Sequence, residues 1–193
     1  MSRAKGGRGR TEELVCHPLT EQRWPDLLRL FGDRGAANGC WCMFWRLRRS
    51  EFEANRSPGN RRALRELVRS GVVPGVLGYR DDEPVGWCSV APREEYGSLE
   101  RSPKYRRTDE TPVWSVVCFF LAREHRGEGL AAALLDGAVA YAGQQGATVV
   151  EGYPVCGDNG SHYMGTASLF GRCGFKQVRR VDERRAVYRR QVG

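Results

Sequence analysis

The chain has 193 residues and a mass of 21.7 kDa, which is enough for one sizeable hydrophobic core. Charged residues interrupt the hydrophobic ones throughout, and no apolar stretch reaches the roughly 18 to 20 residues needed to cross a bilayer. These features exclude an integral membrane protein. The formal net charge of +8 favours anionic partners such as nucleotides or nucleic acid.

Half of that charge lies at the N-terminus, where residues 1–10 carry four basic and no acidic side chains. We expect residues 1–12 to form a flexible basic tail and residues 13–193 to form a single domain. The tail lacks the apolar stretch of a signal peptide, so we expect a cytoplasmic protein. Seven cysteines make an odd count, which favours reduced thiols, and the spacing of Cys40 and Cys42 does not predict a metal site.

The first third of the chain predicts one strand and two helices. Residues 14–19 are typical of a strand, and residues 20–31 predict a capped amphipathic helix that ends in a glycine-rich loop. An aromatic, sulfur-rich run at 40–45 follows. A second helix is predicted over 61–70, behind a turn at 57–60.

The middle of the chain predicts a hairpin and a central strand. Residues 73–79 and 84–90 are apolar runs separated by a charged turn. Residues 93–111 are polar and irregular, so we expect them to run over the surface. Residues 113–121 are so continuously apolar that they predict a strand in the middle of the sheet with both faces covered.

A glycine-rich turn then leads to a helix with apolar residues on one face, which stops near 143–146. Residues 149–153 predict the next strand, so strand, helix and strand form a right-handed crossover with parallel strands. A short helix is expected over 166–172, followed by a terminal hairpin from 175–181 and 185–188.

The turn after the central strand carries the chemistry. Gly127 and Gly129 permit positive φ angles, so successive N–H groups can point at one spot. The following helix adds unpaired N–H groups and the positive end of its dipole, and Arg126 adds a charge, which together suit a pyrophosphate. Taken alone the loop is a weak signal. It lacks the Gly-Lys-Ser/Thr of a nucleoside triphosphatase and the third glycine of a dinucleotide fingerprint.

The segment Arg126-Gly127-Glu128-Gly129-Leu130-Ala131 resembles the acyl-CoA signature of the GNAT superfamily, Arg/Gln-x-x-Gly-x-Gly/Ala, at every fixed position. The long strand before it, the helix after it and a late helix leading to Gly174-Phe175 are similar to the same superfamily over roughly residues 73–190. The resemblance implies an α/β (α+β) fold with a mixed, mostly antiparallel central sheet of about six to seven strands flanked by helices.

The resemblance also implies an N-acetyltransferase that uses acetyl-CoA or another acyl-CoA as co-substrate. The pantetheine arm would pair with the backbone of Phe119, Phe120 and Leu121. The pyrophosphate would lie against Arg126 and the N–H groups of the residues that follow it, namely Gly127, Glu128, Gly129, Leu130 and Ala131.

The acid that protonates the leaving thiolate is less evident. Many relatives use a tyrosine in the late helix, where this chain has Phe170, which has no proton to give. Tyr163 and Tyr153 are alternative candidates. Glu151 is a candidate general base, directly or through water, or else it pairs with an arginine.

The side that receives the acyl group is expected near the first two helices, their connection and the hairpin. Its candidate lining is aromatic and comprises Trp41, Phe44, Trp45, Trp87 and Trp114, although the same side chains could simply fill the core. Cys118 is read as a core residue because no histidine is evident to activate it.

Three functions remain open from the sequence. The leading hypothesis is direct transfer of an acyl group from acyl-CoA to the amine of a small molecule, by a protein that does not bind membranes and that could form a homodimer. The alternatives are a tRNA-dependent acyl or aminoacyl transferase of the same fold, motivated by the basic ends of the chain, and a non-catalytic acyl-CoA-binding module, motivated by Phe170.

Overall fold

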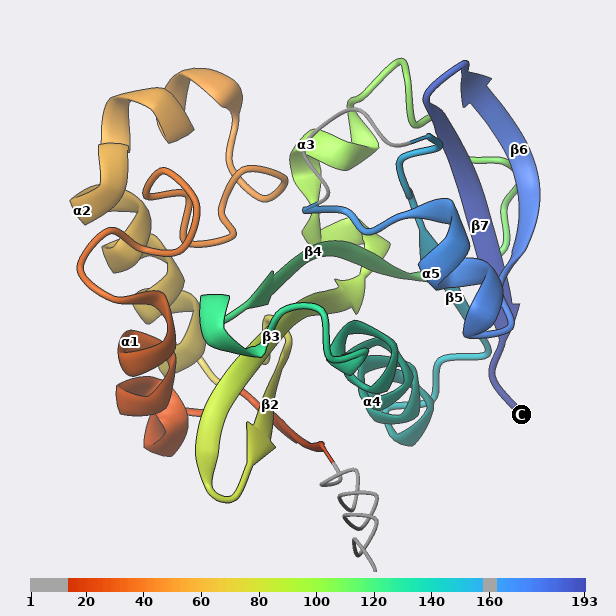
Figure 1. Ribbon diagram of the computed structural model, residues 1–193. Coiled ribbons are helices and arrows are strands. Elements are labelled where there is room, and N and C mark those ends of the chain that lie inside the picture. The colour runs from red at the N-terminus through yellow and green to blue at the C-terminus, as the bar shows by residue number, and fades with distance from the viewer. Residues whose placement is uncertain (1–13, 158–162) are drawn as a thin grey trace, which may run out of the picture.

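The computed structural model describes residues 14–157 and 163–193, so the expected basic tail lies outside the described residues. Seven strands form one sheet in the order β1-β2-β3-β4-β5-β7-β6 (Figure 1). Among these described strands only β4 and β5 pair in parallel, so the sheet is mixed and mostly antiparallel, as predicted. The strands are β1 (Val15–Pro18), β2 (Val76–Arg80), β3 (Glu83–Pro92), β4 (Trp114–Leu121), β5 (Val149–Gly152), β6 (Lys176–Asp182) and β7 (Arg185–Gln191).

The helices connect and cover these strands. A 3-10 turn at Glu21–Arg23 leads into α1 (Trp24–Phe31), and the long α2 (Arg49–Arg69) follows. The remaining α-helices are α3 (Gly97–Glu100), α4 (Leu130–Gln144) and α5 (Ala167–Arg172), and two further 3-10 turns lie at Arg93–Glu95 and Arg123–His125. The α4 crossover between the parallel strands β4 and β5 confirms the predicted strand, helix and strand unit.

The two faces of the sheet carry separate cores because side chains alternate along each strand. Val76 and Cys88 pair across β2 and β3 and join the core under α4 and α5, whereas the next pair, Leu77 and Trp87, joins the core under α1 and α2. Figure 1 shows α1 and α2 together on one side of β2 and β3, with α4 on the other. Helices therefore cover both faces of the central strands.

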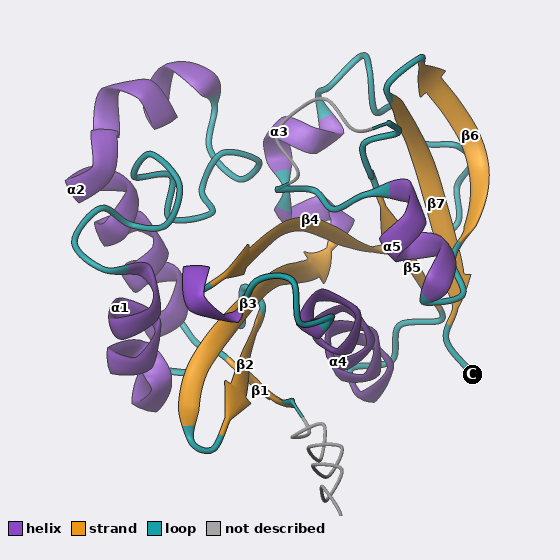
Figure 2. Ribbon diagram, in the orientation of Figure 1, coloured by secondary structure: helices purple, strands orange, loops and turns teal. Residues whose placement is uncertain are grey.

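β4 is the central strand, and it leaves its neighbour β5 halfway along. The parallel pairing covers only Trp114 to Val116, opposite residues 150–152, and β4 then continues to Leu121 beside β3 alone (Figure 2). The pairing with β3 is interrupted too: Ser89 lies opposite Cys118 and Val90 opposite Val116, so Val117 is an extra residue in β4. Such a bulge bends the strand and increases its twist. The second half of β4 therefore borders an opening in the sheet.

Two predicted elements differ from the structure. The second helix begins at Arg49, not at residue 61, and residues 57–60 are helical rather than a turn. α2 consists of two helical segments joined at Arg56, whose φ of 47° and ψ of −167° are not helical, and Pro58 lies in the first turn of the second segment. Proline is tolerated there because that N–H has no helical partner.

The segment 93–111 is the second difference. It was expected to run over the surface because it is polar, yet Tyr96, Leu99 and Tyr105 are buried in a third core with Val117 and Tyr153. Arg93 is 1% exposed, and its guanidinium is neutralised by the buried carboxylate of Glu151 and the partly exposed carboxylate of Glu100. Some of the charged residues that predicted a surface segment form buried ion pairs instead.

Among the described residues, no helix is both long enough and apolar enough to cross a membrane.

Candidate active site

Two cavities adjoin along the second half of β4. The first, the apolar cavity, has a volume of about 400 Å³ and lies against Val117 to Phe120. The second, the signature groove, has a volume of about 750 Å³ and contains Arg126 and Ala131 of the glycine-rich signature. Four residues line both cavities: Asn38, Phe119, Phe120 and Tyr163. A molecule bound in the groove can therefore present one end to the apolar cavity.

The signature groove contains much of the predicted cofactor site. Phe119, Phe120, Leu121, Arg126 and Ala131 all line it, and α5 adds further lining residues, including Leu169 and Arg172. Arg126 Nε donates to the Leu121 carbonyl at 3.0 Å, which anchors the guanidinium beside the end of β4. Two arginines in one groove favour an anionic ligand.

The turn before α4 has the backbone geometry that the glycines predicted. Gly127 and Gly129 have φ angles of 85° and 82°, where other residues are strained, and Gly129 is the N-cap of α4. Because the N-cap residue is a glycine, it has no side chain to cap this end of the helix. Its first N–H groups are therefore available to an anion, and the helix dipole favours one there.

The other two signature residues point elsewhere. Glu128 is held by Arg80 at 2.6 Å, and Leu130 is buried at the start of α4. Their side chains therefore have structural contacts, and any role in binding a ligand would come from their backbone N–H groups. The cofactor assignments of all nine residues stay predictions.

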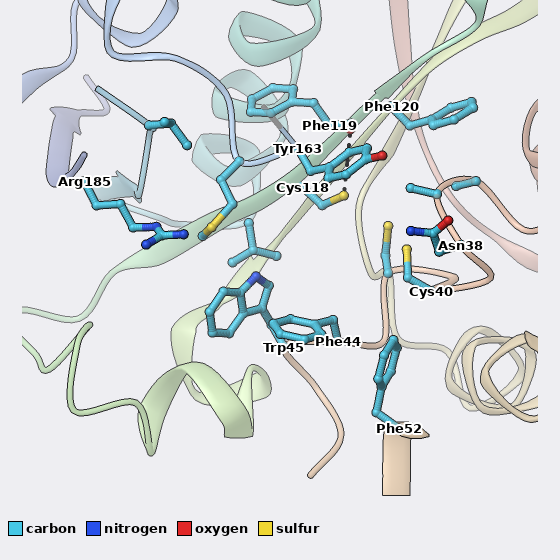
Figure 3. A pocket seen from close by; sticks show the side chains of 16 residues that line it. Asn38, Cys40, Phe44, Trp45, Phe52, Cys118, Phe119, Phe120, Tyr163 and Arg185 are labelled. Carbon is cyan, nitrogen blue, oxygen red and sulfur yellow. Dashed lines mark hydrogen bonds between the residues drawn. The ribbon is translucent and has the colours of Figure 1, made fainter. Parts of the chain in front are cut away.

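Tyr163 lies at the junction of the two cavities, as Figure 3 shows beside Cys118 and Phe119. Its side chain is 49% exposed, and its carbonyl oxygen accepts a hydrogen bond of 2.6 Å from the Phe119 N–H. That bond fixes the backbone of Tyr163 across the opening where β4 has left β5. The polar neighbours Asp158, Asn159 and His162, which were expected to accompany it, lie outside the described residues.

Glu151 and Tyr153 lie instead in a buried network behind the apolar cavity. Glu151 accepts hydrogen bonds from Arg93 at 2.9 Å, from the Tyr153 hydroxyl at 2.7 Å and from Arg189 at 2.7 Å. Ser115 lies 2.8 Å from the same Tyr153 oxygen. Neither Glu151 nor Tyr153 lines either cavity. The pairing of Glu151 with arginines, one of the two alternatives from the sequence, is observed, and the proton-transfer roles of both residues stay predictions.

The buried network also shifts proton affinities. Burial, and next the neighbouring Glu151 carboxylate, raise the pKa of Tyr153 well above its usual value. Burial alone would lower the pKa of Arg93, but Tyr153, Glu100 and Glu151 outweigh it and raise that pKa. Tyr153 is therefore a neutral phenol and Arg93 a cation throughout the physiological range.

The apolar cavity is built largely from aromatic and sulfur-bearing side chains (Figure 3). Of the five predicted aromatic residues, Phe44 and Trp45 line it, whereas Trp41 and Trp87 are buried in the core under α1 and α2, and Trp114 packs against Tyr141. Sequence reasoning missed Asn38, Phe52 and Arg185. Asn38 follows two alanines in the glycine-rich loop, and nothing in that pattern indicates that the loop borders β4.

Three cysteines meet at one wall of this cavity: Cys40, Cys42 and Cys118. None of the seven cysteines, all of which lie in the described residues, forms a disulfide bond. Hydrogen bonding with Cys118, together with burial, raises the pKa of Cys42 well above its usual value. Hydrogen bonding with Cys42, together with burial, likewise raises the pKa of Cys40. Cys40 and Cys42 therefore stay protonated and are poor nucleophiles.

Comparison with known proteins agrees with this geometry. A model of the acetyltransferase (GNAT) family matches residues 41–175, well over half of the chain. The chain belongs to this family and is an N-acetyltransferase, as its signature predicted. No protein with a curated description matches it significantly.

Solved structures share the fold at low sequence identity. A GNAT-family acetyltransferase from Streptococcus agalactiae has a TM-score of 0.56 and 13% identity over 92% of this chain and 95% of its own. A histone acetyltransferase HPA2 and related acetyltransferase from Corynebacterium glutamicum has a TM-score of 0.53 and 19% identity, over 94% and 97%. The PaiA N-acetyltransferase of Thermoplasma acidophilum, solved with coenzyme A, has a TM-score of 0.52 and 14% identity, over 93% and 99%.

Proposed function

We propose that this protein transfers an acetyl group from acetyl-CoA directly to the amine of a small molecule, with the donor in the signature groove and the acceptor in the apolar cavity. The observation that carries the proposal is that the two cavities share Phe119, Phe120 and Tyr163. A thioester that reaches this junction from the groove meets an amine that enters from the other side.

The donor is held by this chain's backbone and by two arginines. The pyrophosphate lies at the N-terminus of α4 against Gly127 to Ala131, with Arg126 beside it. The pantetheine arm runs along β4 past Phe120 and Leu121. Because the Phe119 N–H already donates to the Tyr163 carbonyl, the arm replaces that bond if it extends as far as Phe119.

The reaction needs a neutral amine, which attacks the thioester carbon and forms a C–N bond. The C–S bond then breaks, and the nitrogen loses one proton to solvent as the amide forms. The departing thiolate takes a proton from an acid. Tyr163 is the candidate acid that borders both cavities, and its exposed phenol can recover a proton from water. Tyr153 is the buried alternative for the acid, and Glu151 is the buried candidate for the base that takes the proton of the amine, each acting through an intervening group.

Replacing each tyrosine by phenylalanine tests this assignment. Tyr163→Phe is expected to lower kcat by about 10²-fold or more, because a positioned acid contributes that much, while the affinity for acetyl-CoA stays the same. Tyr153→Phe is the matched comparison, since it also removes a phenol hydroxyl, but from the buried network. The assay measures free thiol released from acetyl-CoA and the acetylated amine by mass spectrometry.

Unchanged kcat in Tyr163→Phe together with a large loss of kcat in Tyr153→Phe would move the acid to the buried network.

The tRNA-dependent alternative is tested in the same assay by supplying aminoacyl-tRNA as donor or acceptor over a range of salt concentrations. A phosphate-binding interface would lose activity steeply as salt rises, whereas transfer between small molecules would not.

A further inference from the structure

The charge of the apolar cavity points to one chemical class of acceptor. Fourteen of the sixteen described lining residues are apolar, aromatic or sulfur-bearing, and the other two are Asn38 and Arg185. None of these described lining residues is acidic, so the described walls of the cavity carry one cation and no carboxylate. An acceptor with several ammonium groups would find no counter-charge on these walls.

Arg185 is the first residue of β7 and reaches the cavity from the end opposite to Asn38 and Phe120 (Figure 3). Among the described residues it pairs with the carboxylate of Asp182, whose Oδ2 lies 3.9 Å from Arg185 Nη1. The same oxygen is held more closely by Lys104, at 2.6 Å. The guanidinium is therefore only loosely paired, and its forked donors match a planar carboxylate.

The Arg185 side chain is 42% exposed, and the apolar side chains of Met164 and Val155 line the same cavity. An anion bound to Arg185 therefore keeps part of its hydration, and its hydrogen bond to the guanidinium is charge-assisted. Arg185 also lowers the pKa of the nearby Tyr105 phenol, against the larger effect of burial, which raises it. The positive potential of Arg185 thus reaches the surrounding groups.

We propose that the acceptor is a primary amine with an apolar body and a carboxylate at the end remote from the amine, and that Arg185 binds this carboxylate. The inference rests on the proposed function, because it places the amine at the Tyr163 junction. Binding the anion at Arg185 leaves the amine to reach the Tyr163 junction, which the cavity shares with the signature groove. The same arrangement disfavours diamines and polyamines, whose second charge would face the guanidinium.

The test compares matched acceptors that differ only in the anion. 4-(Aminomethyl)benzoate is paired with its neutral carboxamide, 6-aminohexanoate is paired with hexylamine, and putrescine represents the diamines. The measured quantity is kcat/KM for each acceptor at saturating acetyl-CoA, with the wild type, Arg185→Gln, Arg185→Lys and the control Arg184→Gln. Arg184 is the exposed neighbour that lines neither cavity.

The wild type is expected to prefer the carboxylate of a pair by about 10- to 100-fold, the usual value of a hydrogen bond to a charged group. Arg185→Gln should bring this ratio close to one, Arg185→Lys should restore part of it, and Arg184→Gln should leave it intact. Equal rates for both members of each pair in the wild type, a preference for putrescine, or an intact ratio in Arg185→Gln would overturn the proposal.

Calorimetric binding of 4-(aminomethyl)benzoate to the CoA-loaded protein separates this inference from the proposed function. Binding that depends on Arg185, without acetylation, would refute transfer to this amine and leave the carboxylate site standing. Acetylation of neutral amines with no dependence on Arg185 would refute the carboxylate site and leave the transferase function standing.

Discussion

At the scale of single residues, the most unusual feature is a buried ion pair network behind the site. Arg93 and Glu151 are 1% and 2% exposed, and Arg93 also contacts Glu100 and the Tyr105 carbonyl. A buried ion costs a great deal unless it is paired and hydrogen-bonded, and here the geometry supplies both. The network joins β4, β5 and the segment after β3, so it fixes the base of the opening in the sheet.

Removing one partner leaves the other charge uncompensated. Arg93→Met is expected to lower the free energy of unfolding by about 3–5 kcal/mol, measured by urea denaturation. Arg49→Met is the control, because its i,i+4 pair with Glu53 is exposed and should matter by less than about 0.5 kcal/mol. A loss below about 1 kcal/mol in Arg93→Met would show that the network contributes little to stability.

At the scale of elements, the sequence predicted the regular parts of the fold well. The apolar run of β4 placed it at the centre of the sheet, and the positions of Gly127 and Gly129 marked the start of α4 correctly. The bulge at Val117 was not evident from the residues themselves, because a bulge depends on the register with β3 and not on composition.

The errors have tertiary causes. The apparent turn at 57–60 is helical, because the non-helical backbone of Arg56 lets Pro58 begin a new segment. The polar segment after Arg93 is buried, because its charges find partners far away in the sequence, such as Glu151. In the candidate site, Arg185 and Asn38 were missed for the same reason. The tertiary fold brings each of them to the cavity, and neither belongs to a recognisable sequence motif.

The kink in α2 yields a prediction at this scale. Arg56 has a φ of 47° and a ψ of −167°, a conformation that glycine adopts far more readily than arginine. Arg56→Gly is therefore expected to raise the free energy of unfolding by about 0.5–1 kcal/mol. Arg62→Gly, at an exposed position inside the second segment, should instead lower it by about 1 kcal/mol. Equal losses in both variants would mean that the kink at Arg56 is not part of the folded state.

At the scale of the whole molecule, several groups that ionise at alkaline pH are buried as neutral species. Cys42, Cys88, Tyr96 and Tyr153 have pKa values raised by burial, and for Cys42 by Cys118 above all. In the unfolded chain these thiols ionise near pH 8.5 and the phenols near pH 10. Above those values the unfolded state loses protons that the folded state keeps, so folding stability must fall as pH rises.

The expected slope is about −1.4 kcal/mol per pH unit for each such group. Urea denaturation at intervals from pH 8 to 10.5 measures it. Cys88→Ala removes one buried thiol, so the slope of unfolding free energy against pH above pH 9 should become shallower by the contribution of one group. This change in slope does not depend on how much the substitution changes stability at pH 7. The same slope in the variant and the wild type would mean that the Cys88 thiol ionises equally well in both states.

The central claim is that the donor binds at the glycine turn before α4, and calorimetric titration of acetyl-CoA tests it most directly. Gly129→Trp is compared with Gly146→Trp. Both glycines have open space around them and similar positive φ angles, 82° and 89°, so the strain is matched. Gly129 is the N-cap of α4, in the same turn as the groove residues Arg126 and Ala131, whereas Gly146 follows the far end of α4. Binding that persists in the wild type and in Gly146→Trp and disappears in Gly129→Trp is the predicted result. Equal binding by all three folded proteins would contradict the account.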